Sequence, residues 1–201
     1  MPERDPPPTA DSDADRLASL FETHRQRLRA MVQRRLDPRL AARICADDVL
    51  QEAFFLAQRK WLARGPGSAA GEFVWLYGIA RDKLIEMCRR EMREIRDVRR
   101  GIPLPEDSSV DLAERLIGSD TPPSSAAARS ERRERIREAL AQLKDTDREI
   151  LWMKHYDELT FREAATVLGL KEDAATLRYF RALERLKRAL VQDNIRSESD
   201  V

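Results

Sequence analysis

The side chains most often used in catalysis are few in this sequence and lie far apart. The two histidines, His24 and His155, have no carboxylate or cysteine at the spacing that a metal site requires. Cys45 and Cys88 each fall in a helical, mostly apolar segment, which indicates small buried hydrophobic residues. The chain also contains no glycine-rich phosphate loop and no nucleophile motif. We therefore expect a protein that is not an enzyme and that carries no cofactor and no metal.

Charged side chains at helical spacing indicate a binding function instead. Asp47, Asp48 and Glu52 form an acidic cluster on about one and a half turns of a predicted helix. Gln51 and Phe54 lie beside this cluster. Such a face suits a basic surface on a protein partner. It equally suits the solvated face of a helix in a bundle, and this segment alone does not decide between the two.

A second group of charged residues lies in TFREAATVLGLKEDAATLRYFRALERL, residues 160–186. The stretch reads as a short helix, a tight turn at Gly169 and a longer helix, which is the helix-turn-helix arrangement. The polar residues expected to face outward are Lys171, Thr176, Arg178, Arg181, Arg185, Lys187 and Arg188. Because arginine can bond guanine in the major groove and lysine can neutralise phosphates, the pattern favours DNA binding. The alternative is an ordinary helical hairpin with a solvated basic face, and the acids Glu172, Asp173 and Glu184 weaken the DNA-binding interpretation.

Apolar periodicity predicts the elements that position these residues. Apolar side chains recur at three- and four-residue steps from Leu17 to Val32, and further helices are predicted over about 40–62 and 72–99. A proline-rich, acidic stretch at 101–125 predicts a linker, after which helical patterns return. Capping boxes, with a threonine and a glutamate three residues later, are predicted at 146–149 and 160–163. The core of the helix pair is predicted to contain Val167, Leu168, Leu170, Leu177, Phe180 and Leu183.

The composition of the whole chain fits two small helical domains. Of 201 residues, 42% are hydrophobic and only 7 are glycine, so compact cores are expected and a turn-rich β fold is not. The 37 basic and 36 acidic residues nearly cancel, so nucleic-acid binding depends on the local distribution of charge. The first 15 residues are polar and proline-rich, which predicts a disordered tail and no secretion signal. With no apolar run of membrane-spanning length, we expect a soluble cytoplasmic protein.

Three segments in order carry a resemblance to a known family. ADDVLQEAFFLAQRKW, residues 46–61, resembles the core-polymerase-binding helix of bacterial extracytoplasmic-function sigma factors of the sigma-70 family. FVWLYGIARDKLIEMCRR, residues 73–90, is similar to the family's promoter-melting helix. LKDTDREILWMKHYDELTFREAATVLGLKEDAATLRYFRALERL, residues 143–186, resembles its C-terminal helix-turn-helix domain. The implied fold is all-α, with sigma domain 2 over 16–100 and sigma domain 4 over 130–192, a polar linker at 101–129, and tails at 1–15 and 193–201.

The resemblance implies a function and a role for individual residues. The chain would bind core RNA polymerase at its clamp and flap regions and direct promoter recognition, DNA opening and transcription initiation, with an anti-sigma factor as a possible regulator. The residues implied in polymerase binding are Asp47, Asp48, Gln51, Glu52 and Phe54. Those implied at the minus-ten element are Trp75, Tyr77, Arg81, Asp82, Lys83, Arg89 and Arg90. Those implied at the minus-thirty-five element are Lys171, Thr176, Arg178, Arg181 and Arg185. By its helical spacing, Trp75 fits a core position better than a DNA contact.

The sequence departs from the family pattern at some of these positions. Asp82 stands where the family usually has asparagine, and Lys171 stands where a small helix N-cap is usual. The common Gly-Thr-Val-Lys run is replaced at 173–176, so base reading is expected to rest on Arg178 and Arg181. The altered helix leaves open a second function, that of a sigma-like interaction module that binds polymerase or an anti-sigma partner without reading promoters. A one-component helix-turn-helix regulator would need a ligand pocket or a dimer helix, and the sequence indicates neither.

Overall fold

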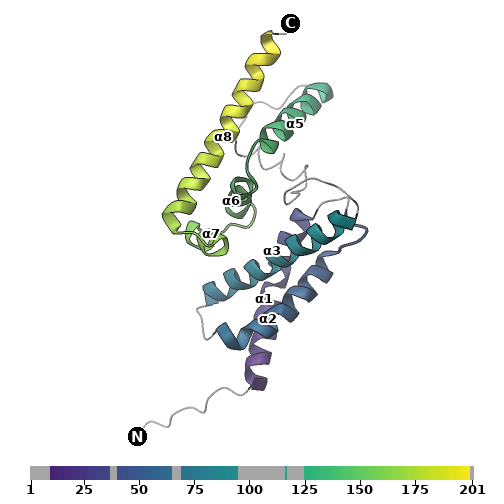
Figure 1. The fold of residues 1–201 in the computed structure, drawn as a ribbon, viewed down its shortest axis with the longest axis vertical. Coiled ribbons are helices and arrows are strands. Elements are labelled where there is room, and N and C mark those ends of the chain that lie inside the picture. The colour runs from purple at the N-terminus through teal and green to yellow at the C-terminus, as the bar shows by residue number, and fades with distance from the viewer. Residues whose placement is uncertain (1–9, 37–39, 65–68, 95–115, 117–124, 200–201) are drawn as a thin grey trace. The chain divides into compact units, whose positions relative to one another are not determined.

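The computed structural model describes residues 10–36, 40–64, 69–94, 116 and 125–199 (Figure 1). Within these residues, every element longer than a single turn is an α-helix, which confirms the predicted all-α fold. The helices are α1 (Ala10–Arg35), α2 (Ala46–Arg64), α3 (Ala69–Glu94), α5 (Ala126–Ala141), α6 (Asp145–His155), α7 (Phe161–Leu168) and α8 (Glu172–Ser199). They form two compact units, one with α1 up to Gln33, α2 and α3, and the other with α5 to α8. None of the helices described is long and apolar enough to cross a membrane.

The first unit begins with α1, which starts earlier than the sequence predicted. Residues 10–15, which the sequence analysis placed in a disordered tail, form the first turns of this helix. Asp13 and Asp15 lie near the positive end of the helix dipole, where acidic side chains stabilise a helix. The rest of the predicted tail, residues 1–9, lies outside the described residues. The apolar stripe of α1 is buried as expected, with Leu17, Leu28, Met31 and Val32 in the core.

α2 and α3 pack against each other, and a cysteine defines where α2 begins. α2 starts at Ala46 instead of near residue 40, because residues 40–43 form a turn. The Cys45 backbone N–H donates to Asp48 Oδ2 at 3.3 Å, and the Asp48 N–H donates to Cys45 Sγ at 3.3 Å. This reciprocal pair satisfies two of the N–H groups that a helix start leaves unpaired. Cys88 is buried as predicted, but Cys45 is exposed, so the prediction that it is buried was wrong.

In the second unit α8 packs against α5, α6 and α7. Both ends of this unit are more helical than predicted, since α5 begins at Ala126 inside the expected linker and α8 continues to Ser199. The buried side chains that hold the unit together are Ile136, Leu140, Leu143, Ile150, Leu151, Trp152, Ala165, Ala175, Ala182 and Leu186. The contributions from α8 are mainly alanines, which allow its backbone to approach the neighbouring helices closely.

One of the two predicted capping boxes is present. At α7, Thr160 Oγ1 accepts a hydrogen bond from the Glu163 N–H at 3.2 Å, and Glu163 Oε2 accepts one from the Thr160 N–H at 2.7 Å. Gly169 ends the helix with φ 64°, a left-handed conformation that glycine adopts without strain. The box predicted at 146–149 was wrong, because α6 begins at Asp145 with Lys144 as its N-cap and no side-chain cap hydrogen bond.

The predicted core of the helix pair was wrong at two residues. Leu177 and Phe180 of α8 remain 49% and 56% exposed, although their size and apolar character suggested burial. The helix instead turns Ala175, Ala182 and Leu186 inward. Val167, Leu168, Leu170 and Leu183 are all partly buried.

Candidate interaction surfaces

The outward face of α2 carries acidic, amide and aromatic side chains in one line. Asp48, Gln51, Glu52 and Phe55 are all exposed, and their spacing of three, four and seven residues places them on the same side of the helix. Hydrogen bonds from the Cys45 side chain and backbone lower the pKa of Asp48, which keeps this carboxylate charged. We call these four residues the α2 face. It can offer negative charge and an apolar ring to a partner with a basic surface.

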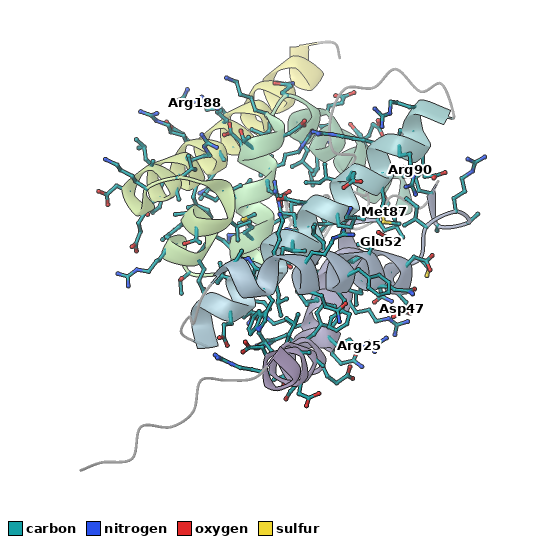
Figure 2. The ribbon with its side chains drawn as sticks, turned by 60° about the horizontal axis from the view of Figure 1, so that its bottom comes forward. Arg25, Asp47, Glu52, Met87, Arg90 and Arg188 are labelled. Carbon is teal, nitrogen blue, oxygen red and sulfur yellow. The ribbon has the colours of Figure 1, made fainter. Side chains whose placement is uncertain are left out.

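Two of the residues predicted for this face are engaged inside the first unit. Asp47 pairs with Arg29 of α1 at 2.9 Å and with Arg25 at 3.8 Å, and Figure 2 shows Asp47 and Arg25 close together. Phe54 is partly buried and meets Phe21 of α1 edge-on, with ring centroids 5.0 Å apart.

Phe55 is the aromatic side chain that the α2 face presents. Sequence reasoning assigned this role to its neighbour Phe54. Phe55 is 47% exposed, one of three large hydrophobic residues exposed in the described part of the chain. The helical spacing of Phe55 from Asp48, Gln51 and Glu52 was the available signal for its place on the outward face.

A polar cleft of about 350 Å³ lies between α2 and α3. Figure 2 shows Glu52 of α2 near Met87 and Arg90 of α3 at this cleft. Its lining residues are Arg43, Asp48, Gln51, Glu52, Lys83, Glu86, Met87 and Arg90. The cleft therefore joins residues that the sequence assigned to polymerase binding with residues that it assigned to minus-ten DNA. Positive and negative side chains both line it, and Lys83 Nζ lies 2.7 Å from Glu86 Oε2, which lowers the pKa of Glu86.

The predicted minus-ten residues of α3 divide into buried and exposed groups. Tyr77 is only 1% exposed, so it is a core residue and does not present a ring to DNA in this conformation. Trp75 is partly buried against Trp61, with centroids 5.7 Å apart, which agrees with the interpretation that it packs. Arg81 pairs with Asp82 at 2.8 Å, so the unusual aspartate offsets the charge of its neighbour.

Exposed positive charge on α3 lies toward the C-terminal end of the helix. Arg89 and Arg90 are both exposed. Arg90 Nε lies 3.6 Å from Glu91 Oε1. Because the Arg90 side chain is exposed, solvent weakens this ion pair. Of the basic residues predicted for the minus-ten element, these two arginines are the exposed ones, since Arg81 and Lys83 are partly buried.

The predicted recognition residues of α8 also differ from one another in their surroundings. Lys171 and Arg181 are exposed, and Arg178 is partly exposed. The Thr176 hydroxyl donates to the Glu172 carbonyl of the preceding turn at 3.0 Å. Arg185 forms an ion pair with Asp147 of α6, whose side chain is only 7% exposed, so this arginine also holds α6 and α8 together.

Acidic residues on α8 are engaged by arginines. Glu172 accepts a hydrogen bond from Arg162 Nε of α7 at 3.3 Å, and Glu184 pairs with Arg188 one turn later (Arg188 is labelled in Figure 2). These pairs offset two of the three acids that weakened the DNA-binding interpretation. Within residues 171–188 there are six basic and three acidic side chains, so the helix surface has a net positive charge.

The histidines lie in packing positions. His24 contacts the Phe73 ring with centroids 4.9 Å apart, and His155 Nε2 lies 2.9 Å from the Tyr179 hydroxyl. Burial lowers the pKa of both histidines, and the nearby charges of Arg27 and Lys154 lower it further. Burial also raises the pKa of Tyr179. Across the described residues, no group of three or more His, Cys, Asp or Glu side chains is placed to hold a metal ion.

Comparison with known proteins gives a match to a family model and a match to a curated relative. A family model described as sigma-70, region 4, matches residues 133–186, which contain α6, α7 and the first half of α8. The ECF RNA polymerase sigma factor SigM of Bacillus subtilis (strain 168) is 27% identical over 144 residues, which cover 71% of this chain and 77% of that protein.

Two solved structures match most of this chain, and the first of them has a similar fold. CnrH in complex with the cytosolic domain of CnrY matches with a TM-score of 0.52 and 23% identity, over 92% of this chain and 96% of that one. The sigma factor RpoE in complex with the anti-sigma factor NepR from Bartonella quintana matches with a TM-score of 0.47 and 18% identity, over 88% and 94% of the two chains.

Proposed function

We propose that the two units of this chain have separate roles. The chain belongs to the sigma-70 family as an extracytoplasmic-function sigma factor. It directs RNA polymerase to promoters without catalysing a reaction. We assign α1, α2 and α3 to sigma domain 2, which binds core polymerase and the minus-ten element. We assign α5 to α8 to sigma domain 4, which binds the minus-thirty-five element. The protein acts in the cytoplasm, where its polymerase and promoter partners are found.

The observation that carries this proposal is the geometry of α7, Gly169 and α8. Thr160 caps the start of α7, and Gly169 ends that helix in the left-handed conformation, so both ends of α7 are fixed. α8 packs on α6 and α7 through its small residues, which leaves its opposite side exposed and positively charged. A helix held in this way fits the major groove, where arginine side chains can bond the edges of bases.

Polymerase binding is assigned to the α2 face. Asp48 and Glu52 provide exposed negative charge, Gln51 provides a hydrogen-bonding amide, and Phe55 provides an apolar ring at the same side of the helix. Opposite charges across an interface increase the rate and specificity of association, and a buried aromatic ring commonly supplies much of the affinity. Asp47 acts indirectly, because its pairs with Arg25 and Arg29 hold α1 beside the start of α2.

Minus-ten binding is assigned to the exposed basic residues of α3. Arg89 and Arg90 are accessible and can neutralise phosphates as the DNA strand is opened. Lys83 and Arg81 are mostly covered and paired with acids, so they position the surrounding side chains. Trp75 and Tyr77 support the helix from its packed side.

A regulator that covers one of these surfaces is part of the proposal. We expect an anti-sigma factor to bind the chain and to compete with polymerase, because the α2 face is exposed and carries both charge and an aromatic ring. Such a partner should be basic where it meets Asp48 and Glu52.

In vitro transcription tests the proposed function. The purified chain is mixed with core RNA polymerase and a promoter library, and the transcripts are sequenced. We expect initiation from a limited set of related promoters that depends on the added chain. Stable binding to core polymerase without promoter-dependent initiation would contradict this function and support the interaction module instead.

A further inference from the structure

Leu177 and Phe180 form an exposed apolar pair on α8 that the proposed roles of the arginines do not explain. The two residues are three positions apart, so they lie on the same side of the helix. They are 49% and 56% exposed, while Ala175, Ala182 and Leu186 fill the packed side. The packing of the unit therefore does not require large apolar side chains at these two positions.

The Phe180 ring is held in place from one side. Its centroid lies 5.3 Å from that of Tyr179 in an edge-on arrangement and 6.5 Å from that of Phe161 on α7. Phe161 and Tyr179 are themselves edge-on at 5.4 Å, and the Tyr179 hydroxyl lies 2.9 Å from His155 Nε2. Because these contacts restrict the ring before any partner arrives, binding through its free side loses less conformational entropy.

The surroundings of the pair favour DNA over a protein partner. Arg178 and Arg181 follow Leu177 and Phe180 directly in the sequence, and the helix surface carries a net positive charge. A stable protein interface usually buries about 800 Å² on each partner, which is much more than two side chains provide. In the major groove, by contrast, an apolar contact as small as the C5 methyl group of one thymine carries sequence information.

We propose that Leu177 and Phe180 contact thymine C5 methyl groups in the upstream promoter element, so that this sigma factor reads part of that element through apolar contacts. The proposal rests on the function assigned to α8 above. Arg178 and Arg181 bond base edges and phosphates beside the same thymines. Phe161 and Tyr179 are positioning residues, since they fix the orientation of the Phe180 ring.

Removing single methyl groups from the DNA tests this proposal. Holoenzyme assembled with the full chain is bound, at one fixed salt concentration, to a promoter selected from the library. Each upstream thymine is then replaced in turn by deoxyuridine, which lacks only the C5 methyl group. We expect wild-type holoenzyme to bind about fourfold more weakly at one or two of these positions, which is the factor for burying one methyl-sized group. Leu177→Ala or Phe180→Ala should abolish that difference at its own position.

Lys187→Ala is the matched control, because Lys187 is an exposed residue of the same helix. It should weaken binding to thymine and deoxyuridine DNA equally, as loss of a phosphate contact does. Circular dichroism should give unchanged helicity for all variants, since the replaced side chains are exposed.

Three results would overturn the inference while leaving the proposed function intact. In the first, the promoters that the library selects contain no upstream thymine. In the second, wild-type holoenzyme binds every deoxyuridine-substituted DNA as tightly as the thymine DNA. In the third, the alanine variants still prefer DNA that carries the methyl group. Loss of core association in the alanine variants would also overturn it, since it would mark the pair as a protein contact. Failure of the proposed function is separate, because the wild-type chain would then select no promoter.

Discussion

The exposed faces of α2 and α8 both carry charged residues at helical spacing beside an aromatic ring. The charge is negative on α2 and positive on α8. On α2, Asp48 and Glu52 lie in line with the aromatic ring of Phe55. On α8, arginines lie beside the aromatic ring of Phe180, and the acids Glu172 and Glu184 are paired with arginines. Both helices leave a large apolar side chain in solvent, and the charge around it differs in sign.

This difference indicates which class of partner each helix binds. Negative charge repels the phosphate backbone, so the α2 face is suited to a basic protein surface. In the roles that we propose, positive charge on α8 attracts the backbone and brings its apolar pair to the base edges. The two faces should therefore fail independently when either one is altered.

Charge reversal on the α2 face should have the largest effect. Asp48→Lys combined with Glu52→Lys places positive charge against a basic surface, and like charges at an interface are strongly unfavourable. We expect core polymerase to bind the double variant more than about 100-fold more weakly, with helicity unchanged. Fluorescence titration with core polymerase measures the loss.

Reversing two exposed acids of α5, Glu131→Lys with Glu138→Lys, is the control with the same change in charge. It should leave core association close to that of wild type. An equal loss in both double variants would mean that net charge, and not the α2 face, controls the binding.

The next largest effect should come from Arg178 of α8. Arg178→Ala should reduce promoter binding by the holoenzyme by about 1–3 kcal/mol at constant salt if the side chain reads a base. Core association should not change, because the substitution lies outside the α2 face. Titrating holoenzyme onto the selected promoter and onto unrelated DNA separates base reading from phosphate contact. An equal loss on both DNAs would mean that Arg178 contacts only phosphate.

Arg185 and Arg188 should differ in what they contribute to stability. Arg185→Ala leaves the buried Asp147 carboxylate without its arginine, so we expect the free energy of unfolding to fall by about 2 kcal/mol. Arg188→Ala removes only an exposed pair with Glu184 and should cost less than about 0.5 kcal/mol. Urea unfolding of the two variants measures the difference. Equal stabilities would show that the Arg185 pair is not structural.

The smallest effect should be a dependence of stability on pH that both units share. The folded-state pKa values of His24 and His155 lie below the ordinary value of 6.5, so the unfolded chain takes up protons first. The free energy of unfolding should be greatest above pH 6.5. It should fall as the pH decreases from 6.5 toward the folded-state pKa values. Urea unfolding on both sides of this window measures the fall. A variant with glutamine at both histidines should lose much of this decrease in the free energy of unfolding. If stability depends on pH as steeply in that variant as in wild type, the two histidines are not its cause.

Local signals predicted much of the fold, because they depend on neighbouring residues alone. Thr160, Glu163 and Gly169 fix the two ends of α7 through short-range hydrogen bonds and backbone conformation, and the structure has all three in the predicted roles. The box predicted with Thr146 as N-cap was wrong because the N-cap of α6 is Lys144, two residues earlier.

Burial was harder to predict, because it depends on which face of a helix its neighbours cover. Leu177 and Phe180 were expected in the core on account of their size, but alanines on α8 allow close packing on the opposite side. Tyr77 was expected to meet DNA and is buried instead. Phe54 and Phe55 are adjacent and chemically identical, but Phe54 packs against Phe21 of α1 and Phe55 stays exposed.

Footprinting of the holoenzyme tests the separation of the two faces most directly. Wild-type holoenzyme on a library-selected promoter should protect two stretches of DNA, the minus-ten and the minus-thirty-five elements. Holoenzyme with Arg178→Ala and Arg181→Ala in α8 should still form, should still protect the minus-ten element, and should lose protection upstream. Protection of both elements, or loss of both together, would contradict the account in which α8 reads the upstream element independently of the first unit.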